Sequence, residues 1–146
     1  MNYKLIILIL VVAFFLGATH QLKAFDNVTQ HKIEEQIWAL EEVYIANHRD
    51  GNIDGIIPIW HDKFLGWPDN LPHPANKKGV IKYTKQRITF PGSWDFKIER
   101  KGIQIYGNIV VNHYLLHISG RTTRVIHTWV KENTQWKILG GMSNRL

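Results

Sequence analysis

The spacing of apolar residues changes along the chain and predicts helices first and strands afterwards. In the first long polar stretch, apolar residues recur at intervals of four, three and four: Ile33, Ile37, Leu40 and Tyr44. This spacing places them on one face of an amphipathic helix. Asp26 or Asn27 can cap its start, and Gly51 can end it in a left-handed conformation.

Prolines limit the elements of the next segment. Asp54 can cap a short helix that ends near Asp62, because Pro58 then falls in the first turn, where a backbone N–H lacks an intrahelical partner. Residues 65–76 contain three prolines and a glycine, which predicts a loop, and loops of this length are often functional lids. A third helix, over about 76–87, should follow this loop.

Beyond this point the apolar residues alternate with period two, which is typical of strands. The predicted strands cover 94–100, 103–107, 109–118, 121–131 and 135–142. Their connections are short, with the sequences KG, GN, SG and NT, and short turns join antiparallel neighbours. Helices followed by such a meander predict an α+β fold, with the helices packed on one face of a curved sheet.

The short turns also predict the register of the strands, and the register predicts which side chains share a face. His127 should lie opposite Asn112 and Gly140, and Val125 should lie opposite Tyr114. Val125 should also lie opposite Met142. One face then collects a mostly apolar set: Trp94, Phe96, Ile98, Ile103, Ile105, Val110, Asn112, Tyr114, Leu116, Val125, His127, Trp129, Trp136, Ile138 and Met142.

Three polar members of this set, Asn112, Tyr114 and His127, are predicted neighbours. Gly140 has no side chain, so it leaves volume beside the His127 ring. Either the three residues face a cavity that holds a ligand, or they satisfy one another's hydrogen bonds inside a dry core. Histidine is also the residue type best suited to gain and lose a proton near neutral pH.

A histidine, a carboxylate and a tyrosine could together support proton abstraction beside a carbonyl group, followed by stabilisation of the oxyanion. The candidate catalytic residues are therefore His127, Asp62 and Tyr114, although a carboxylate near a helix end can equally be a cap or a surface charge. We place the candidate pocket for an apolar ligand at Trp60, Phe64, Trp67, Trp94, Asn112, Trp129 and Met142, of which the tryptophans could instead be packing residues.

The opposite face of the sheet is mixed, and its aliphatic residues predict that something covers it. They are Leu115, Ile126, Val130 and Leu139. A second copy of the chain is the natural cover, because two-fold homodimers are the commonest assembly. His113 and His117 share this face but lie about 13 Å apart along a strand, too far for one metal ion. We expect no metal and no cofactor.

The first residues predict export. An uninterrupted apolar run, Leu5–Ala18, is too short for a comfortable membrane span and follows Lys4, which is typical of a secretory signal peptide. We predict cleavage after Ala24, with residues 1–24 as signal peptide and 25–146 as the domain of a secreted or periplasmic protein. The alternative is an uncleaved anchor in the membrane.

Composition narrows the range of partners. The chain has no cysteine, which excludes a disulfide, a thiol nucleophile and a lipid anchor on cysteine. The net charge of +6 falls to +4 when Lys4 and Lys23 leave with the signal peptide. The basic stretch 76–87 is either a solvated helix face or a patch for anions or membrane surfaces. No motif indicates nucleic-acid binding.

The chain resembles the nuclear transport factor 2-like superfamily, and most closely its SnoaL-like branch. The resemblance rests on the first helix, on "NIDGIIPIWHDKFLGWP" and on "TRVIHTWVKENTQWKILGGMS", and covers about residues 28–144. The matching positions are Asp62, Phe64, Trp67, Pro68, Trp129 and Trp136. It implies a cone-like curved antiparallel sheet wrapped around about three N-terminal helices, a pocket at the open end and often a homodimer.

The resemblance implies no particular reaction, because the superfamily includes isomerases, dehydratases, cyclases, epoxide hydrolases and non-catalytic binders. Two hypotheses follow. The chain is either a pocket protein for a small hydrophobic ligand, with or without acid/base chemistry, or a non-catalytic interaction module that assembles through its outer sheet face.

Overall fold

The computed structural model describes residues 28–88, 92 and 94–146. The predicted signal peptide and the capping residues Asp26 and Asn27 lie outside the described residues. The chain divides into two compact units, Met1–Gln36 and Ile37–Leu146, with the division inside the first helix, residues 28–49. The sheet and the site described below belong to the second unit.

The elements after the first helix alternate between short helices and strands before the meander begins. They are α2 (Ile53–Ile56), a 3₁₀ turn (Ile57–Ile59), β1 (Trp60–Trp67), β2 (Ala75–Asn76), α3 (Lys77–Arg87), β3 (Phe96–Tyr106), β4 (Ile109–Ile118), β5 (Arg121–Glu132) and β6 (Gln135–Arg145). Among the described residues, no helix is long and apolar enough to cross a membrane.

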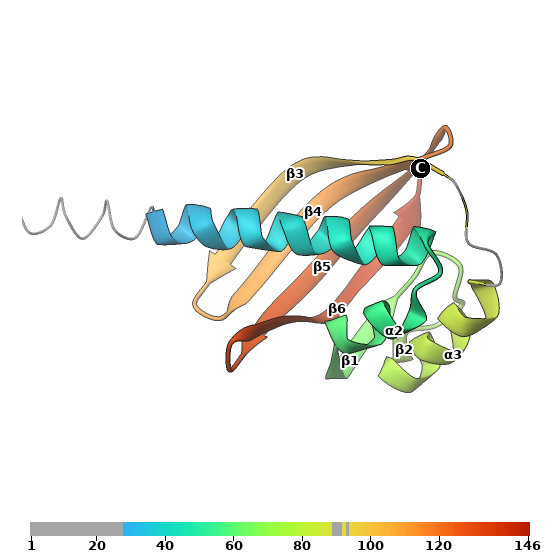
Figure 1. Cartoon of the computed structure of the whole chain (residues 1–146), viewed down its shortest axis with the longest axis horizontal. Coiled ribbons are helices and arrows are strands. Elements are labelled where there is room, and N and C mark those ends of the chain that lie inside the picture. The colour runs from blue at the N-terminus through green and yellow to red at the C-terminus, as the bar shows by residue number, and fades with distance from the viewer. Residues whose placement is uncertain (1–27, 89–91, 93) are drawn as a thin grey trace, which may run out of the picture. The chain divides into compact units, whose positions relative to one another are not determined.

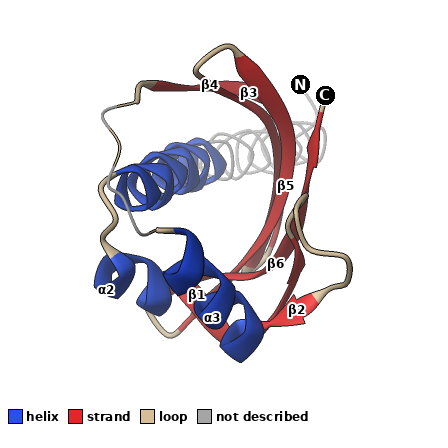
Figure 2. Cartoon of the chain, turned by 90° about the vertical axis from the view of Figure 1, so that its right-hand side faces the viewer, coloured by secondary structure: helices blue, strands red, loops and turns tan. Residues whose placement is uncertain are grey.

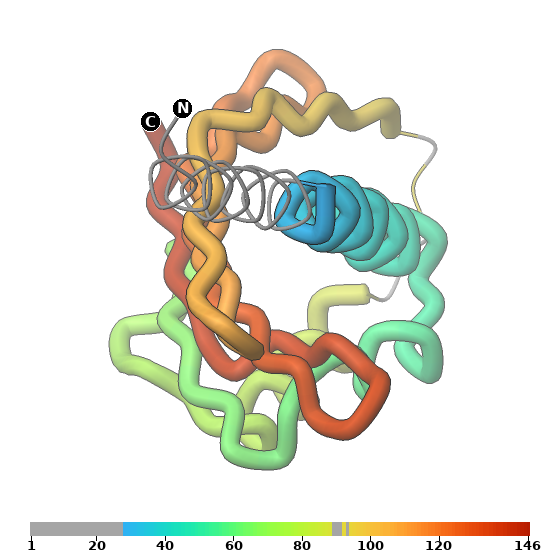
Figure 3. The backbone as a smooth tube through the Cα atoms, turned by 90° about the vertical axis from the view of Figure 1, so that its left-hand side faces the viewer, coloured from blue at the N-terminus to red at the C-terminus, as the bar shows by residue number. Residues whose placement is uncertain are grey.

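The described strands form one curved sheet in the order β2-β1-β6-β5-β4-β3. Figure 1 shows β3 to β6 side by side, and β1 continues the sheet by pairing in parallel with β6. The part of the first helix that belongs to the second unit, residues 37–49, lies on the concave side of this sheet (Figures 2 and 3). The predicted α+β class with a curved sheet wrapped around N-terminal helices is confirmed.

The predicted hairpin turns are confirmed where the backbone needs a left-handed residue. Gly107, Ser119, Gly120 and Asn133 all have positive φ, as tight turns between antiparallel strands require. The KG turn, by contrast, was a wrong prediction. The chain does not reverse there, because the two predicted strands are one strand, β3 (Phe96–Tyr106), whose register against β4 shifts between Arg100 and Gly102.

The helix predicted to begin at Asp54 is shorter than expected. Asn52, and not Asp54, caps α2, since the Asn52 side chain accepts a hydrogen bond from the backbone N–H of Gly55. The helix gives way to β1 at Trp60, inside the segment predicted to be helix and loop. This strand was missed because its partner is β6, far away in the sequence, and no local turn reveals a parallel pair. Asn76 caps α3.

The predicted register holds on one side of β5 and fails on the other. Asn112 pairs with His127 as expected, but His127 pairs with Gly141 and not with Gly140. The cause is a bulge in β6, where Trp129 pairs with Ile138 while Thr128 pairs with Gly140. The extra residue shifts every later position of β6 to the opposite face.

The bulge therefore changes which side chains of β6 face the helix. Val125 pairs with Ser143 and not with Met142, and Thr123 pairs with Arg145. Ser143 and Arg145 thus join the inner face, and Met142 pairs with Ile126 and not with Val125. The hydroxyl of Ser143 and the guanidinium of Arg145 therefore belong to the inner face, where the sequence had predicted the apolar Met142.

Candidate functional site

A buried carboxylate stands at the centre of the inner face. Glu41, on the first helix, is fully buried. Asn112 Nδ2 donates to it at 2.9 Å, the Tyr114 hydroxyl at 3.0 Å and Trp129 Nε1 at 2.8 Å. Nδ1 of His127 lies 2.9 and 3.0 Å from its two oxygens. Four side chains from β4 and β5 therefore converge on one carboxylate.

The strand register explains this convergence. Asn112 pairs with His127 across β4 and β5, and Tyr114 and Trp129 lie one step away on either side of that pair on the same face. Alternate residues of neighbouring strands point to one face of a sheet, so the four side chains form a compact group. Glu41 reaches this group from the helix that crosses the concave side.

The surroundings of Glu41 hold it in the ionised form. Burial alone would raise its pKa, but the electrostatic interaction with His127 and the hydrogen bonds from His127, Asn112 and Trp129 outweigh burial and lower the pKa below its ordinary value. Burial, together with the nearby Glu41, raises the pKa of Tyr114 well above its ordinary value. Tyr114 therefore keeps its proton and directs it to Glu41.

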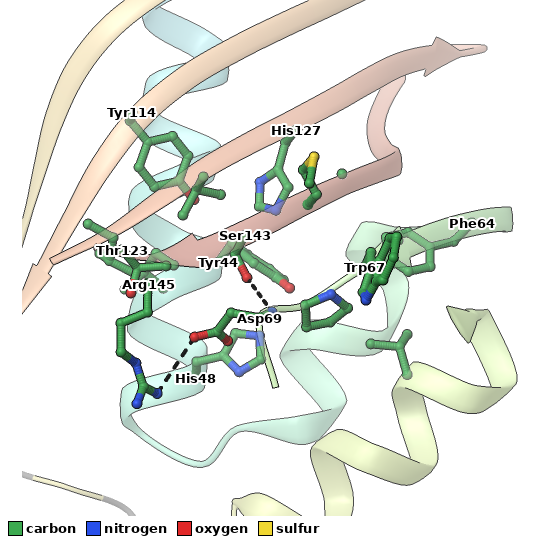
Figure 4. Close-up of a pocket in the computed structure, with 18 residues that line it drawn as sticks. Tyr44, His48, Phe64, Trp67, Asp69, Tyr114, Thr123, His127, Ser143 and Arg145 are labelled. Atoms are coloured by element: carbon green, nitrogen blue, oxygen red, sulfur yellow. Dashed lines mark hydrogen bonds and ion pairs between the residues drawn. The ribbon is translucent and has the colours of Figure 1, made fainter. Parts of the chain in front are cut away.

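A cavity of about 270 Å³ lies on the other side of His127. Its apolar walls include Ile45, Phe64, Val80, Leu116, Val125 and Met142, and its polar groups include Tyr44, His48, Asp69, Thr123, Ser143 and Arg145. Figure 4 shows these residues around the space into which the His127 ring points. The cavity is thus mostly apolar, with a few polar groups, as ligand pockets usually are.

His127 belongs both to the buried network and to the cavity wall. Its side chain is 13% exposed, and Nδ1 contacts Glu41. Within the described part of the chain, Nε2 has no hydrogen-bond partner. The sequence left two alternatives open, a ligand cavity and a dry core in which the polar groups satisfy one another. Both are present: Asn112 and Tyr114 donate hydrogen bonds to the buried Glu41, and His127 contacts Glu41 and also borders the cavity.

Tyr44 and His48 follow Glu41 on the same helix and complete the wall beside His127. The Tyr44 ring packs edge-on against the His127 ring, with 5.5 Å between centroids. Burial is the main cause that raises the pKa of Tyr44, and its hydroxyl accepts a 3.3 Å hydrogen bond from Trp60 Nε1. Burial, and then the electrostatic interaction with His127, lower the pKa of His48 from 6.5 to about 4. At neutral pH, His48 is uncharged and Tyr44 has a proton to donate.

The loop after β1 forms one rim of the cavity and is fastened to β6. The backbone N–H of Asp69 donates to the Ser143 hydroxyl at 3.0 Å, and the Asp69 carboxylate lies 3.6 Å from a guanidinium nitrogen of Arg145. Trp67 Nε1 donates to the backbone carbonyl of Leu71 at 2.8 Å, which folds the loop on itself. Both side chains of β6 reach this rim because of the bulge.

The structure brings together part of the residues selected from the sequence. His127, Tyr114, Phe64, Trp67 and Met142 line the cavity. Asn112 and Trp129 do not line it, but they hold Glu41.

Three selected residues lie elsewhere. The Asp62 side chain is 86% exposed and bound to Lys77 at 2.8 Å, because Asp62 lies within strand β1 and not at a helix end by the cavity mouth. The buried Trp60 lines a neighbouring hollow behind Tyr44, and Trp94 lines a further hollow with Arg121.

In the described parts of the chain, no group of three or more histidine, aspartate or glutamate side chains could hold a metal ion.

Glu41 was missed, although the sequence contains a signal for it. It lies four residues after Ile37 and three before Tyr44, so the helical period places it on the apolar face. A charged residue on that face must find partners or coordinate a ligand. Ser143 and Arg145 had no such signal, since a bulge cannot be read from the alternation alone.

Comparisons with known proteins identify the fold. No family model matches the chain, and no curated protein matches it. A solved NTF2-like protein of unknown function from Pseudomonas putida KT2440 is similar, with 16% identity and a TM-score of 0.70 over 78% of this chain and 87% of that one. Another from Silicibacter pomeroyi DSS-3 has 13% identity and a TM-score of 0.65 over 80% of this chain and 98% of that one.

The chain has the NTF2-like fold. A third solved NTF2-like protein, from Cytophaga hutchinsonii, agrees, with 16% identity and a TM-score of 0.62 over 77% of this chain and 98% of that one. The resemblance drawn from the first helix and the closing hairpin is thereby confirmed for the fold.

Proposed function

We propose that the chain binds a small, mostly apolar molecule in the cavity beside His127, and that His127 exchanges a hydrogen bond or a proton with it. One observation supports this above all: the buried Glu41 carboxylate occupies Nδ1 of His127 at 2.9 Å and leaves Nε2 to a ligand. A cavity with an apolar wall and one oriented imidazole is suited to a ligand with a polar group such as a carbonyl.

The geometry suits proton abstraction from a carbon beside that carbonyl. Glu41 fixes the ring tautomer, so that Nε2 presents a lone pair, and it stabilises the positive charge that the ring acquires with the proton. Tyr44, whose hydroxyl accepts from Trp60, can donate its own proton to the developing oxyanion. Tyr114 was the predicted donor, but its proton is directed to Glu41, so Tyr114 is a positioning residue.

A screen of small carbonyl compounds by thermal shift, followed by NMR in D₂O, tests this proposal. A binder should raise the melting temperature and exchange its α-protons for deuterium. His127→Gln should abolish the exchange, whereas His113→Gln, which changes an exposed histidine on the outer face of β4, should not. Equal behaviour of the two variants would show that His127 has no role in the cavity.

We further propose that the protein is exported, with residues 1–24 as a cleaved signal peptide. The support is the short apolar run Leu5–Ala18 after Lys4. Mass spectrometry of the protein from its own host should detect a chain that begins near Phe25. A chain that keeps residues 1–18 would favour the membrane-anchored alternative.

The second candidate function is an assembly module that forms a homodimer through the outer sheet face. Aliphatic side chains on the outer face support it, because Leu115 on β4 and Ile126 and Val130 on β5 are only partly buried there. Ile126→Glu should convert a dimer to a monomer in analytical ultracentrifugation, whereas Val43→Glu, on the helix, should not. A monomeric wild type at micromolar concentration would refute the dimer.

A further inference from the structure

The cavity beside His127 adjoins a second hollow at one end of the inner face. This hollow, of about 370 Å³, shares Thr123 and Arg145 with the cavity and adds Arg121 and Trp94 to its wall. Figure 4 shows Thr123 and Arg145 at one end of the cavity, and Phe64 and Trp67 at the other. The space beside His127 and the arginine-lined hollow therefore meet at Thr123 and Arg145.

The strand register brings the two arginines together. Arg121, Thr123 and His127 alternate along β5 on its inner face, and Thr123 pairs with Arg145 on β6. Arg121 and Arg145 are thus diagonal neighbours, about 7–8 Å apart at the backbone and within reach of one anion between their long side chains. The bulge in β6 is the reason that Arg145 faces inward at all.

The charges around this hollow are unbalanced. In the described chain, Arg121 has no ion pair, and no acidic residue lines the hollow. Arg145 has a single acidic neighbour, Asp69, at 3.6 Å, and that carboxylate lies on the cavity side. Two arginines and Thr123 therefore line a hollow that no carboxylate of the described residues lines. Guanidinium groups match the two oxygens of a carboxylate better than any other cation in proteins.

We propose that the Arg121–Arg145 hollow binds the carboxylate of the ligand whose apolar body lies against His127, so that the ligand is an apolar carboxylic acid. This inference rests on the proposed function of the cavity. Thr123 and His127 are four residues apart on one strand, which is about 13 Å at the usual rise. The ligand therefore spans up to about this distance, as a medium-length fatty acid or a shorter fused two-ring acid does.

Two probes of equal shape test the inference: naphthalene-2-carboxylate and its neutral amide, naphthalene-2-carboxamide. Their affinities for the full chain are measured by isothermal titration calorimetry at low and high salt. The carboxylate should bind about tenfold more tightly than the amide at low salt and lose most of that advantage at high salt, because exposed charges are screened. Arg121→Gln and Arg145→Gln should each weaken carboxylate binding about fivefold and leave amide binding unchanged.

Arg124→Gln is the matched control, since Arg124 is exposed on the same strand but faces the outer side. It should change neither affinity. If the amide binds and neither inner arginine variant affects the carboxylate, or if Arg124→Gln weakens it equally, the inference is wrong while the pocket stands. If neither probe binds to the wild type, both the inference and the proposed binding function are overturned.

Discussion

The two ends of the inner face around His127 differ in how their charges are treated. At the closed end, Glu41 is fully buried and receives hydrogen bonds from four side chains. At the open end, the Arg145 side chain is 57% exposed and has one distant carboxylate partner. A buried charge must be satisfied by the fold itself, whereas a charge at an open rim can be satisfied by water or by a ligand. The closed end therefore fixes the position of the His127 ring, and the arginine at the open end is available to bind an anion.

Removal of the Glu41 carboxylate should have the largest effect. Glu41→Ala leaves the donors of Asn112, Tyr114 and Trp129 without a partner in a dry interior, which should lower the free energy of unfolding by about 3–5 kcal/mol. Glu42→Ala, one residue further along the helix and exposed, should change it by less than about 0.5 kcal/mol. Urea titration measures both variants, and equal losses would contradict a central role for Glu41.

Acidification should destabilise the protein through His48. Its pKa falls from 6.5 to about 4 on folding, so the unfolded chain takes up the proton first as the pH falls. Stability is thus fully present above pH 6.5 and declines by roughly 2–3 kcal/mol toward pH 4. His48→Asn should flatten the decline in this window. The lowered pKa of Glu41 adds a further loss only at lower pH. An unchanged pH profile in the variant would exclude His48 as the cause.

Truncation of His127 should lower the free energy of unfolding by an intermediate amount, because His127 both contacts Glu41 and borders the cavity. His127→Ala removes one charged hydrogen bond from Glu41 but leaves the donors of three other side chains, so the loss should be about 2 kcal/mol. The sequence alone allowed a smaller loss for a ligand-filled cavity and a larger one for a closed core. Urea titration distinguishes these values, and a loss as large as that of Glu41→Ala would place His127 wholly in the closed network.

Neutralisation of Asp69 at the open end should have the smallest effect on stability. Asp69→Asn removes a long ion pair with an exposed arginine, which should change the free energy of unfolding by less than about 0.5 kcal/mol. It should also increase the affinity for naphthalene-2-carboxylate two- to threefold, because Arg145 loses its competing anion. A large loss of stability would show that the Asp69–Arg145 ion pair holds the fold together and that the open end is structural.

Turn residues and the alternation of apolar residues were enough to predict the antiparallel strands and the side chains that β4 and β5 contribute to the site. The turns at Gly107, at Ser119–Gly120 and at Asn133 were predictable because tight hairpins need residues that tolerate positive φ. These turns fixed the register that places Asn112 opposite His127. The inward direction of Asn112, Tyr114, His127 and Trp129 followed from alternation alone.

The partners of those side chains became known only from the tertiary structure. Glu41 is far from His127 in the sequence, and nothing local links the helix to the strands that bond it. Strand β1 escaped detection because its partner is a distant parallel strand, and this displaced Asp62 from the predicted cavity mouth to the surface. The bulge in β6 brought Ser143 and Arg145 inward, because one extra residue reverses the faces of all that follow. Periodicity determines the direction of a side chain within its own element, but its partner depends on contacts between elements that are distant in the sequence.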